Sequence, residues 1–118
     1  MAKSKKIELS KEDLEEIAQI REDLRSQLIE QNKFGKHFES LVEDYINLEK
    51  LKRKIQKDID DNGIRIVVMT GNGFKSEKPN ESVQNILKVN GQQLKILQDL
   101  DLKEPSQTPK DGEGDDLL

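Results

Sequence analysis

Apolar residues recur along the chain at spacings of three and four, which predicts amphipathic helices. The first helix is expected to begin at Ser10, because its hydroxyl can cap the helix with Asp13 three residues on, and acidic residues crowd the first turn. The apolar stripe of this helix consists of Leu14, Ile17, Ile20, Leu24 and Leu28. Asn32 and Gly35 interrupt the pattern and predict a short turn into a second helix.

The second helix is expected from about Lys36 to Asn62 and should be the longest in the chain. Its apolar positions with 3,4 spacing are Phe38, Leu41, Tyr45, Leu48, Ile55 and Ile59. They predict a coiled-coil-like seam of roughly 40 Å at 1.5 Å per residue. Gly63 fits the position just beyond the end of this helix.

A β-hairpin is expected at about 64–78, where the helical pattern stops. The segment Ile64 to Thr70 is rich in β-branched residues, a Gly-Asn-Gly turn follows, and Phe74 to Lys78 would form the returning strand. The alternative is an extended loop, because an isolated two-stranded hairpin is marginally stable unless it packs on something else.

The third helix should begin after Pro79, with Asn80 as its N-cap, and end at about Leu100 or Leu102. Its apolar arc is wider than one packing partner needs, which predicts contact with the rest of the chain on one side and with a neighbouring subunit on the other. Asn90 lies within the stripe, either as a polar residue that sets register across a helix interface or as a side chain facing water. The predicted oligomerisation residues are Val83, Ile86, Leu87, Asn90, Leu94 and Leu97, and an adjoining flank carries Val89, Ile96 and Leu100.

These elements predict a mainly α fold: a helical hairpin, a third helix for oligomerisation and a small β-hairpin. Residues 1–9 are expected to form a basic flexible arm, residues 10–102 a single helical domain, and residues 103–118 a disordered acidic tail. With 118 residues, 32% of them hydrophobic, the chain has only a thin core of its own. A chain of this kind often gains stability from copies of itself.

Composition argues against catalysis. The chain has no cysteine and a single histidine, His37, so thiolate metal sites, disulfides and two-histidine motifs are excluded and we expect no metal or other cofactor. The Gly-Asn-Gly segment lacks the Gly-Lys-Ser/Thr ending of a phosphate-binding loop, and the carboxylates are dispersed along helices. We therefore expect neither enzymatic activity nor a small-molecule substrate. No apolar run reaches the roughly 20 residues of a membrane span, so a soluble intracellular protein without a membrane partner is expected.

Local basic surfaces favour duplex DNA as a partner, although the formal net charge is −4. A group near the N-terminus and the first turn comprises Lys3, Lys5, Lys6, Arg21, Arg25, Lys33 and Lys36, and a second group on the second helix comprises Lys50, Arg53, Lys54 and Lys57. Neither group is interleaved with aromatic residues, which favours backbone contacts with a duplex over stacking on a single strand. The second group has acidic residues four positions away, for example Glu49 before Arg53, so ordinary pairing on the helix surface is an alternative.

The segments "GKHFESLVEDYINLEKLKRKIQKDIDDNG" and "NGFKSEKPNESVQNILKVNGQQLKILQDLDLKEP" resemble the small subunit of bacteriophage terminases, in the group from tailed phages of Gram-positive hosts. The resemblance covers about residues 35–105. It implies a DNA-recognition subunit that assembles as a homo-oligomeric ring, binds the packaging initiation site of the viral genome, and recruits and regulates the terminase large subunit, an ATPase and nuclease. It also implies action in the host bacterial cytoplasm. The sequence lacks an obvious separate N-terminal helix-turn-helix domain such as some of these subunits carry.

Two other classes of function are compatible with the residues. One is a coiled-coil assembly or adaptor protein without a nucleic-acid role. The other is a small transcription regulator whose first two helices contact DNA. Salt-dependent DNA binding separates the adaptor from the other two, and the size of the oligomer separates a ring from a regulator, which would normally be a dimer.

Overall fold

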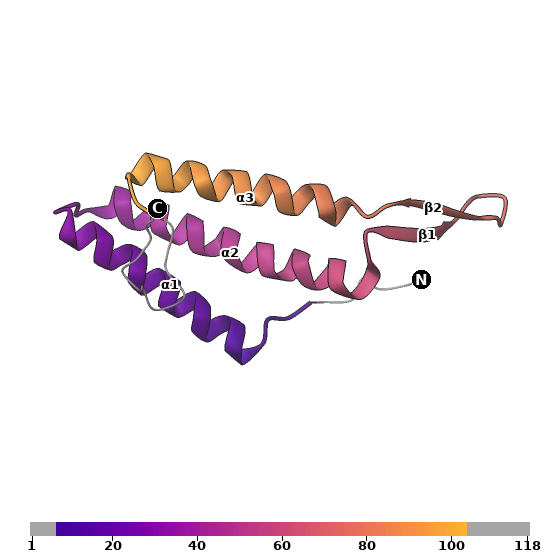
Figure 1. Ribbon diagram of the computed structural model, residues 1–118, viewed down its shortest axis with the longest axis horizontal. Helices are drawn as coiled ribbons and strands as arrows, with labels where there is room; N and C mark the ends of the chain where they lie inside the picture. The colour runs from indigo at the N-terminus through magenta and orange to yellow at the C-terminus, as the bar shows by residue number, and fades with distance from the viewer. Residues whose placement is uncertain (1–6, 104–118) are drawn as a thin grey trace, which may run out of the picture.

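The computed structural model describes residues 7–103, which form three helices and a two-stranded antiparallel sheet. Helix α1 spans Lys11–Glu30, α2 spans Lys36–Asn62 and α3 spans Glu81–Leu100. Strands β1, Arg65–Met69, and β2, Lys75–Pro79, connect α2 to α3. Figure 1 shows α3 lying along α2, with α1 on another side of α2 and the hairpin extending beyond the ends of the helices. The mainly α fold with a small hairpin is therefore confirmed.

Helix α1 begins as the sequence predicts. Ser10 is the N-cap: its hydroxyl accepts from the Asp13 backbone N–H, and the Asp13 carboxylate accepts in return from the Ser10 backbone N–H, which completes a capping box. Four members of the predicted stripe are buried, from Ile17 to Leu28, but Leu14 is 49% exposed. Figure 1 gives the reason, because the first turns of α1 diverge from α2.

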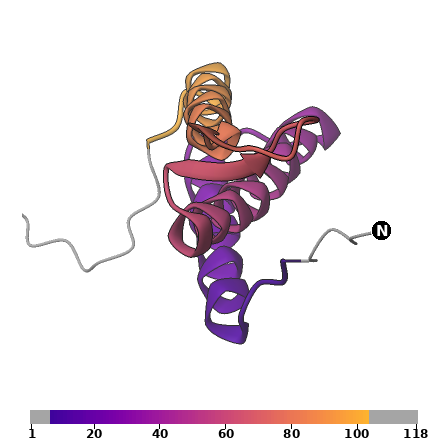
Figure 2. The same cartoon turned by 90° about the vertical axis from the view of Figure 1, so that its right-hand side faces the viewer.

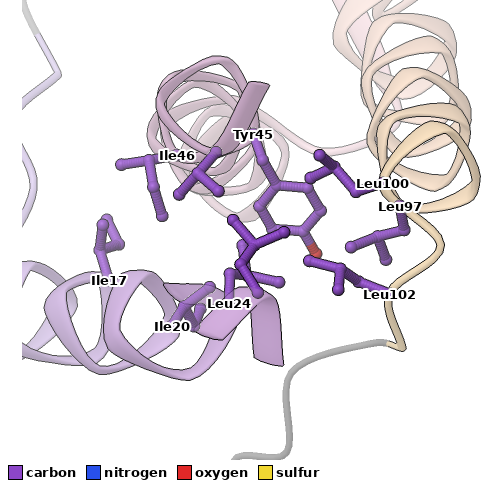
Figure 3. Packing of buried hydrophobic residues seen from close by; sticks show 10 residues of the cluster. Ile17, Ile20, Leu24, Tyr45, Ile46, Leu97, Leu100 and Leu102 are labelled. Carbon is purple, nitrogen blue, oxygen red and sulfur yellow. The ribbon is translucent and has the colours of Figure 1, made fainter. Parts of the chain in front are cut away.

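The core lies near the α1–α2 turn, where the end of α3 meets the other two helices (Figure 3). Leu24 from α1, Ile46 from α2 and Leu100 from α3 are each 0% exposed. Leu102, just after α3, folds back onto the same cluster. The chain therefore buries a small apolar core at one end of its longest axis.

Helix α2 buries more than the single seam expected from its sequence. Tyr45 belongs to both the predicted seam and the buried set, but Val42, Ile46 and Glu49 are buried as well. The other predicted seam residues, Phe38, Leu41, Leu48, Ile55 and Ile59, are only half-buried. The prediction of a single seam on α2 is therefore partly wrong, because α1 and α3 contact this helix on two sides and widen its buried face.

The predicted hairpin is present, so the alternative of an extended loop is wrong. The strands pair from Arg65↔Pro79 to Met69↔Lys75, and the chain reverses where the Thr70 backbone N–H donates to Phe74 O at 2.7 Å and Gly73 adopts a φ of +83°. Val67, Met69 and Phe74 are each at least 60% exposed. Figures 1 and 2 show the hairpin beyond the helix ends, where none of the three described helices covers it.

A buried polar junction fixes the hairpin to the helices. Asn80, 7% exposed, caps α3 by accepting from the Ser82 backbone N–H, while its amide donates to Gly63 O and to the Asp58 carboxylate. Ser82 also donates its hydroxyl to Asp58 at 2.6 Å. The hydrogen bonds from Ser82 and Asn80 lower the pKa of Asp58. The end of α2 and the start of α3 are therefore held together through one carboxylate.

Most of the predicted N-terminal arm and C-terminal tail lie outside the described residues. Of the arm, residues 7–9 are described, and Leu9 packs against the core. Of the tail, only Lys103 is described, where its backbone N–H donates to the Gln27 side chain.

Candidate functional site

Arg53, one of the predicted DNA-binding residues, is the centre of an intramolecular ion-pair cluster. Its guanidinium contacts Glu49 on its own helix at 2.9 Å, and Asp13 and Glu16 on α1 at 3.0 and 2.6 Å. Burial would lower the pKa of Arg53, but the hydrogen bonds to Glu16, Glu49 and Asp13 outweigh it and raise the pKa. With 15% of its side chain exposed, Arg53 holds the start of α1 against α2.

The pKa values of Asp13 and Glu49, two acidic members of this cluster, are lowered. Burial would raise the pKa of Asp13, but hydrogen bonds from Arg53, Ser10 and Lys57 lower the pKa to about 2. Burial would also raise the pKa of Glu49, which hydrogen bonds from Gln93 and Arg53 and the charge of Lys52 lower instead. Gln93 on α3 donates to Glu49 at 3.0 Å, so the cluster connects all three helices.

The other cations on the second helix are placed differently from one another. Lys57 pairs with Asp13 at 3.3 Å, not with the acid four residues along its own helix that the sequence suggested. Lys50 is half-buried and Lys54 is exposed, and neither side chain makes an ion pair within residues 7–103. Of the four predicted residues in this group, Arg53 and Lys57 are thus engaged within the chain.

The described cations near the α1–α2 turn also include some that are bound within the chain and some that are not. Arg21 forms a two-point contact with Glu43 through bonds of 2.9 and 3.1 Å, and Lys33 donates its ammonium group to Leu100 O. Arg25 and Lys36 are exposed, and their side chains form no hydrogen bond or ion pair in the part of the chain that the structure describes. Lys3, Lys5 and Lys6 lie outside that part.

A hollow of about 370 Å³ lies beside these cations. Arg25 and Lys33 contribute to its wall together with Ile29 and Phe34, which are 59% and 66% exposed. Glu22 and Glu39 also line it, so the hollow has charges of both signs. Its mixed surface does not single out one class of ligand, and the exposed Arg25 and Lys36 remain the clearest candidates for phosphate contacts at this end of the molecule.

The predicted oligomerisation residues of α3 separate into two sets. Leu97 is 4% exposed and belongs to the core within the chain, and Ile86 is half-buried. Leu87 and Leu94 are 66% and 43% exposed, Asn90 is exposed between them, and Val83 is half-buried. The intrachain contact instead uses Val89, Gln93 and Leu100, which are buried together with Leu97. The helix thus packs through the predicted flank and leaves much of the predicted stripe uncovered.

Glu49 and Gln93 are buried positions that sequence reasoning missed, because both are polar residues on otherwise amphipathic helices.

Within residues 7–103, no group of three or more His, Cys, Asp and Glu side chains is placed to hold a metal ion. None of the described helices combines the length and the apolar character that crossing a membrane requires. Comparison of the chain with family models, with curated proteins and with solved structures yields no match.

Proposed function

We propose that this chain is a non-enzymatic DNA-recognition subunit of the terminase small-subunit type. In this proposal it assembles as a homo-oligomeric ring, binds the packaging initiation site on duplex viral DNA, and recruits and regulates a large subunit that carries ATPase and nuclease activity. Its place of action would be the host bacterial cytoplasm. The proposal originates in the resemblance of residues 35–105, and two features of the described surface support it.

The observation that carries the self-association is apolar surface that residues 7–103 leave exposed. Val67, Met69 and Phe74 on the hairpin and Leu87 on α3 are each at least 60% exposed. An isolated two-stranded hairpin is only marginally stable, and burial of each such side chain contributes about 1.5–3 kcal/mol relative to leaving it exposed. Contact with further copies of the chain would therefore stabilise the projecting part of the fold.

The DNA-binding part is supported by the position of the cations that the fold leaves exposed. Arg25 and Lys36 lie close to the α1–α2 turn and have no acidic partner among the described residues. Lys33, between them in the chain, is anchored on Leu100 O but carries its charge at the same end. An oligomer would repeat this group in every copy, which raises the local density of positive charge beyond that of one chain.

An adaptor without a nucleic-acid role is the second candidate, and the internal pairing of cations favours it. Arg21, Arg53 and Lys57, three of the residues predicted to contact phosphate, are bound to carboxylates within the chain. Salt bridges of this kind hold helices together without any DNA. The two candidates therefore differ in whether the remaining exposed cations suffice for binding.

Two measurements on the full chain test the proposal. Its native mass should correspond to a closed homo-oligomer larger than a dimer, and its affinity for duplex DNA should fall steeply as salt rises, with a log-log slope of about −0.9 for each phosphate neutralised. A stable monomer at micromolar concentration would remove the assembly. An oligomer without salt-sensitive DNA binding would favour the adaptor.

A further inference from the structure

The exposed surface of α3 separates into a charged side and an uncharged side. At 3.6 residues per turn, an arc of about 120° contains only uncharged residues over four turns, and all but the half-buried Val83 are exposed. The members of this uncharged arc are Val83, Gln84, Leu87, Asn90, Gly91, Leu94 and Gln98. The charged residues of the helix, Glu81, Lys88, Lys95 and Asp99, lie outside it. In a chain with 37% charged residues, such a surface resembles the core of an interface, where charge is depleted.

Gly91 lies within this arc, and the fold of the single chain gives no reason for a glycine there. It is in the middle of α3 and has no positive φ, so its backbone suits any residue. A Cβ added at Gly91 would have no atom within 4 Å, so no part of the described chain approaches it closely. Glycine inside a helix is less stable than alanine because it loses more backbone freedom on folding. A contact from outside the chain would account for it.

The side chains on either side of Gly91 fit a contact of this kind. Leu87 lies one turn before it and Leu94 one turn after it, 66% and 43% exposed. An approaching helix would come nearest at the missing side chain, since the distance between packed helices depends on the side chains at the contact point, and it would bury the two leucines around that point. Next to the arc, Ile86, Leu87 and Asn90 line a groove whose α2 side includes Lys52 and Gln56.

We infer that the uncharged arc of α3 binds a second copy of this chain, and that the two copies approach each other most closely at Gly91. The partner surface must itself be largely uncharged, because burying unpaired charges against the arc would cost free energy. The described chain supplies such a surface in the arc itself, whereas Val67 and Met69 on the hairpin share their face with Arg65, Lys75 and Glu77. The inference rests on the self-association in the proposed function and is independent of DNA binding.

The test compares substitutions of Gly91 with the same added bulk elsewhere on α3, in the full chain. Gly91→Ala and Gly91→Leu fill the point of closest approach, whereas Asn85→Leu adds bulk at an exposed position about 120° around the helix. Far-UV circular dichroism reports helix content, and sedimentation velocity over a concentration series reports association. Neither Gly91 variant should lose helix content, because the Cβ meets no neighbour and both residues favour a helix over glycine.

We expect Gly91→Leu to raise the subunit dissociation constant about tenfold or more, a loss of ~1.4 kcal/mol of association free energy. Gly91→Ala should weaken association less, and Asn85→Leu should leave it unchanged. If the wild-type chain assembles and both Gly91 variants assemble equally well, the inference is wrong while the proposed function stands. An equal effect of Asn85→Leu also overturns it. If the wild-type chain is a monomer at micromolar concentration, the assembly proposed for its function fails as well.

Discussion

The guanidinium of Arg53 on α2 contacts the carboxylate of Asp13 in the first turn of α1, with Nη1 3.0 Å from Oδ1. The two helices diverge at this point, as Figure 1 shows, and Leu14 in the same turn is 49% exposed. Apolar packing therefore contributes little here. Long charged side chains bridge the distance, and this end of the helical hairpin depends on the protonation state of its carboxylates.

Acid should loosen the start of α1. The pKa of Asp13 falls from 3.8 to about 2 on folding, and a group whose folded pKa is depressed contributes stability above its unfolded pKa. That contribution should be lost as the pH falls from about 5 through 2. Urea unfolding across this range should show that Asp13→Asn destabilises the protein at pH 7 and has a smaller effect at pH 2. Glu15→Gln, at an exposed acid without an ion pair in residues 7–103, is the matched control. Equal pH profiles for wild type and Asp13→Asn would contradict the assignment.

The same helix allows a comparison of buried and exposed leucines. Leu24 is 0% exposed in the core that Figure 3 shows, so Leu24→Ala should cost about 2–5 kcal/mol of unfolding free energy through reduced burial and the cavity left behind. Leu14→Ala, the same substitution at a 49% exposed position, should cost about 0.5 kcal/mol. Chemical denaturation measures both values. Similar losses of unfolding free energy for the two variants would mean that Leu14 is packed more tightly than its 49% exposure indicates.

Asn80 should control how firmly the hairpin is attached. Asn80→Ala removes the N-cap of α3 and the hydrogen bonds to Gly63 O and Asp58, so we expect a loss of about 1–3 kcal/mol. Amide hydrogen exchange should also accelerate in β1 and β2 relative to α1. Asn85→Ala, at an exposed position on the same helix, should neither lower the unfolding free energy nor accelerate exchange in the strands, because alanine favours a helix over asparagine. If exchange in the strands is unaffected by Asn80→Ala, the junction does not anchor the hairpin.

Local signals in the sequence predicted the helix starts and the hairpin well. The sequence predicts an N-cap at Ser10 from its spacing to Asp13, and a second N-cap at Asn80 from its place after a proline. Both caps depend only on residues a few positions apart, and both are present in the structure. The Gly-Asn-Gly turn likewise depends only on its neighbours, and β1 and β2 meet on either side of it. Interactions of this range can be identified without knowing the fold.

The stripe predicted for α1 is buried except for Leu14, but the buried faces of α2 and α3 could not be predicted in the same way. On α2 the periodicity indicates one apolar stripe, but α1 and α3 contact this helix on two sides. On α3 the periodicity indicates a wide apolar arc, but it does not show which side of that arc packs within the chain. The partners of Arg53 lie 37 and 40 positions earlier in the chain at Glu16 and Asp13. Their proximity depends on how α1 crosses α2, which no local pattern encodes. For this reason the predicted basic group on α2 contains an exposed lysine, Lys54, and also Arg53 and Lys57, which pair with carboxylates on α1.

Arg53 is a poor choice for testing DNA binding, because its role in the fold would confuse the result. Its removal would leave Glu49, which is 5% exposed, without its closest cationic partner. A change in DNA affinity could then come from a disturbed α1–α2 contact. The test therefore needs cations that hold no other part of the described chain.

DNA binding should depend on the cations that the fold leaves exposed near the α1–α2 turn. Under the proposed function, Arg25→Gln with Lys36→Gln should weaken duplex binding and make the log-log salt slope shallower by up to about 0.9 for each phosphate that is no longer neutralised. Neither side chain makes an ion pair in the described part of the chain, so the double variant should keep its fold and its oligomer mass. Lys88→Gln with Lys95→Gln removes the same charge from exposed positions on α3 and should change the slope less. Fluorescence anisotropy with a labelled duplex measures the slopes between about 50 and 200 mM salt, an interval over which phosphate contacts change affinity strongly. If the two double variants have equally reduced slopes, the α1–α2 turn has no special role in DNA binding. If both variants keep the slope of the wild type, the phosphate contacts are made by cations outside residues 7–103 or by the remaining cations of α2.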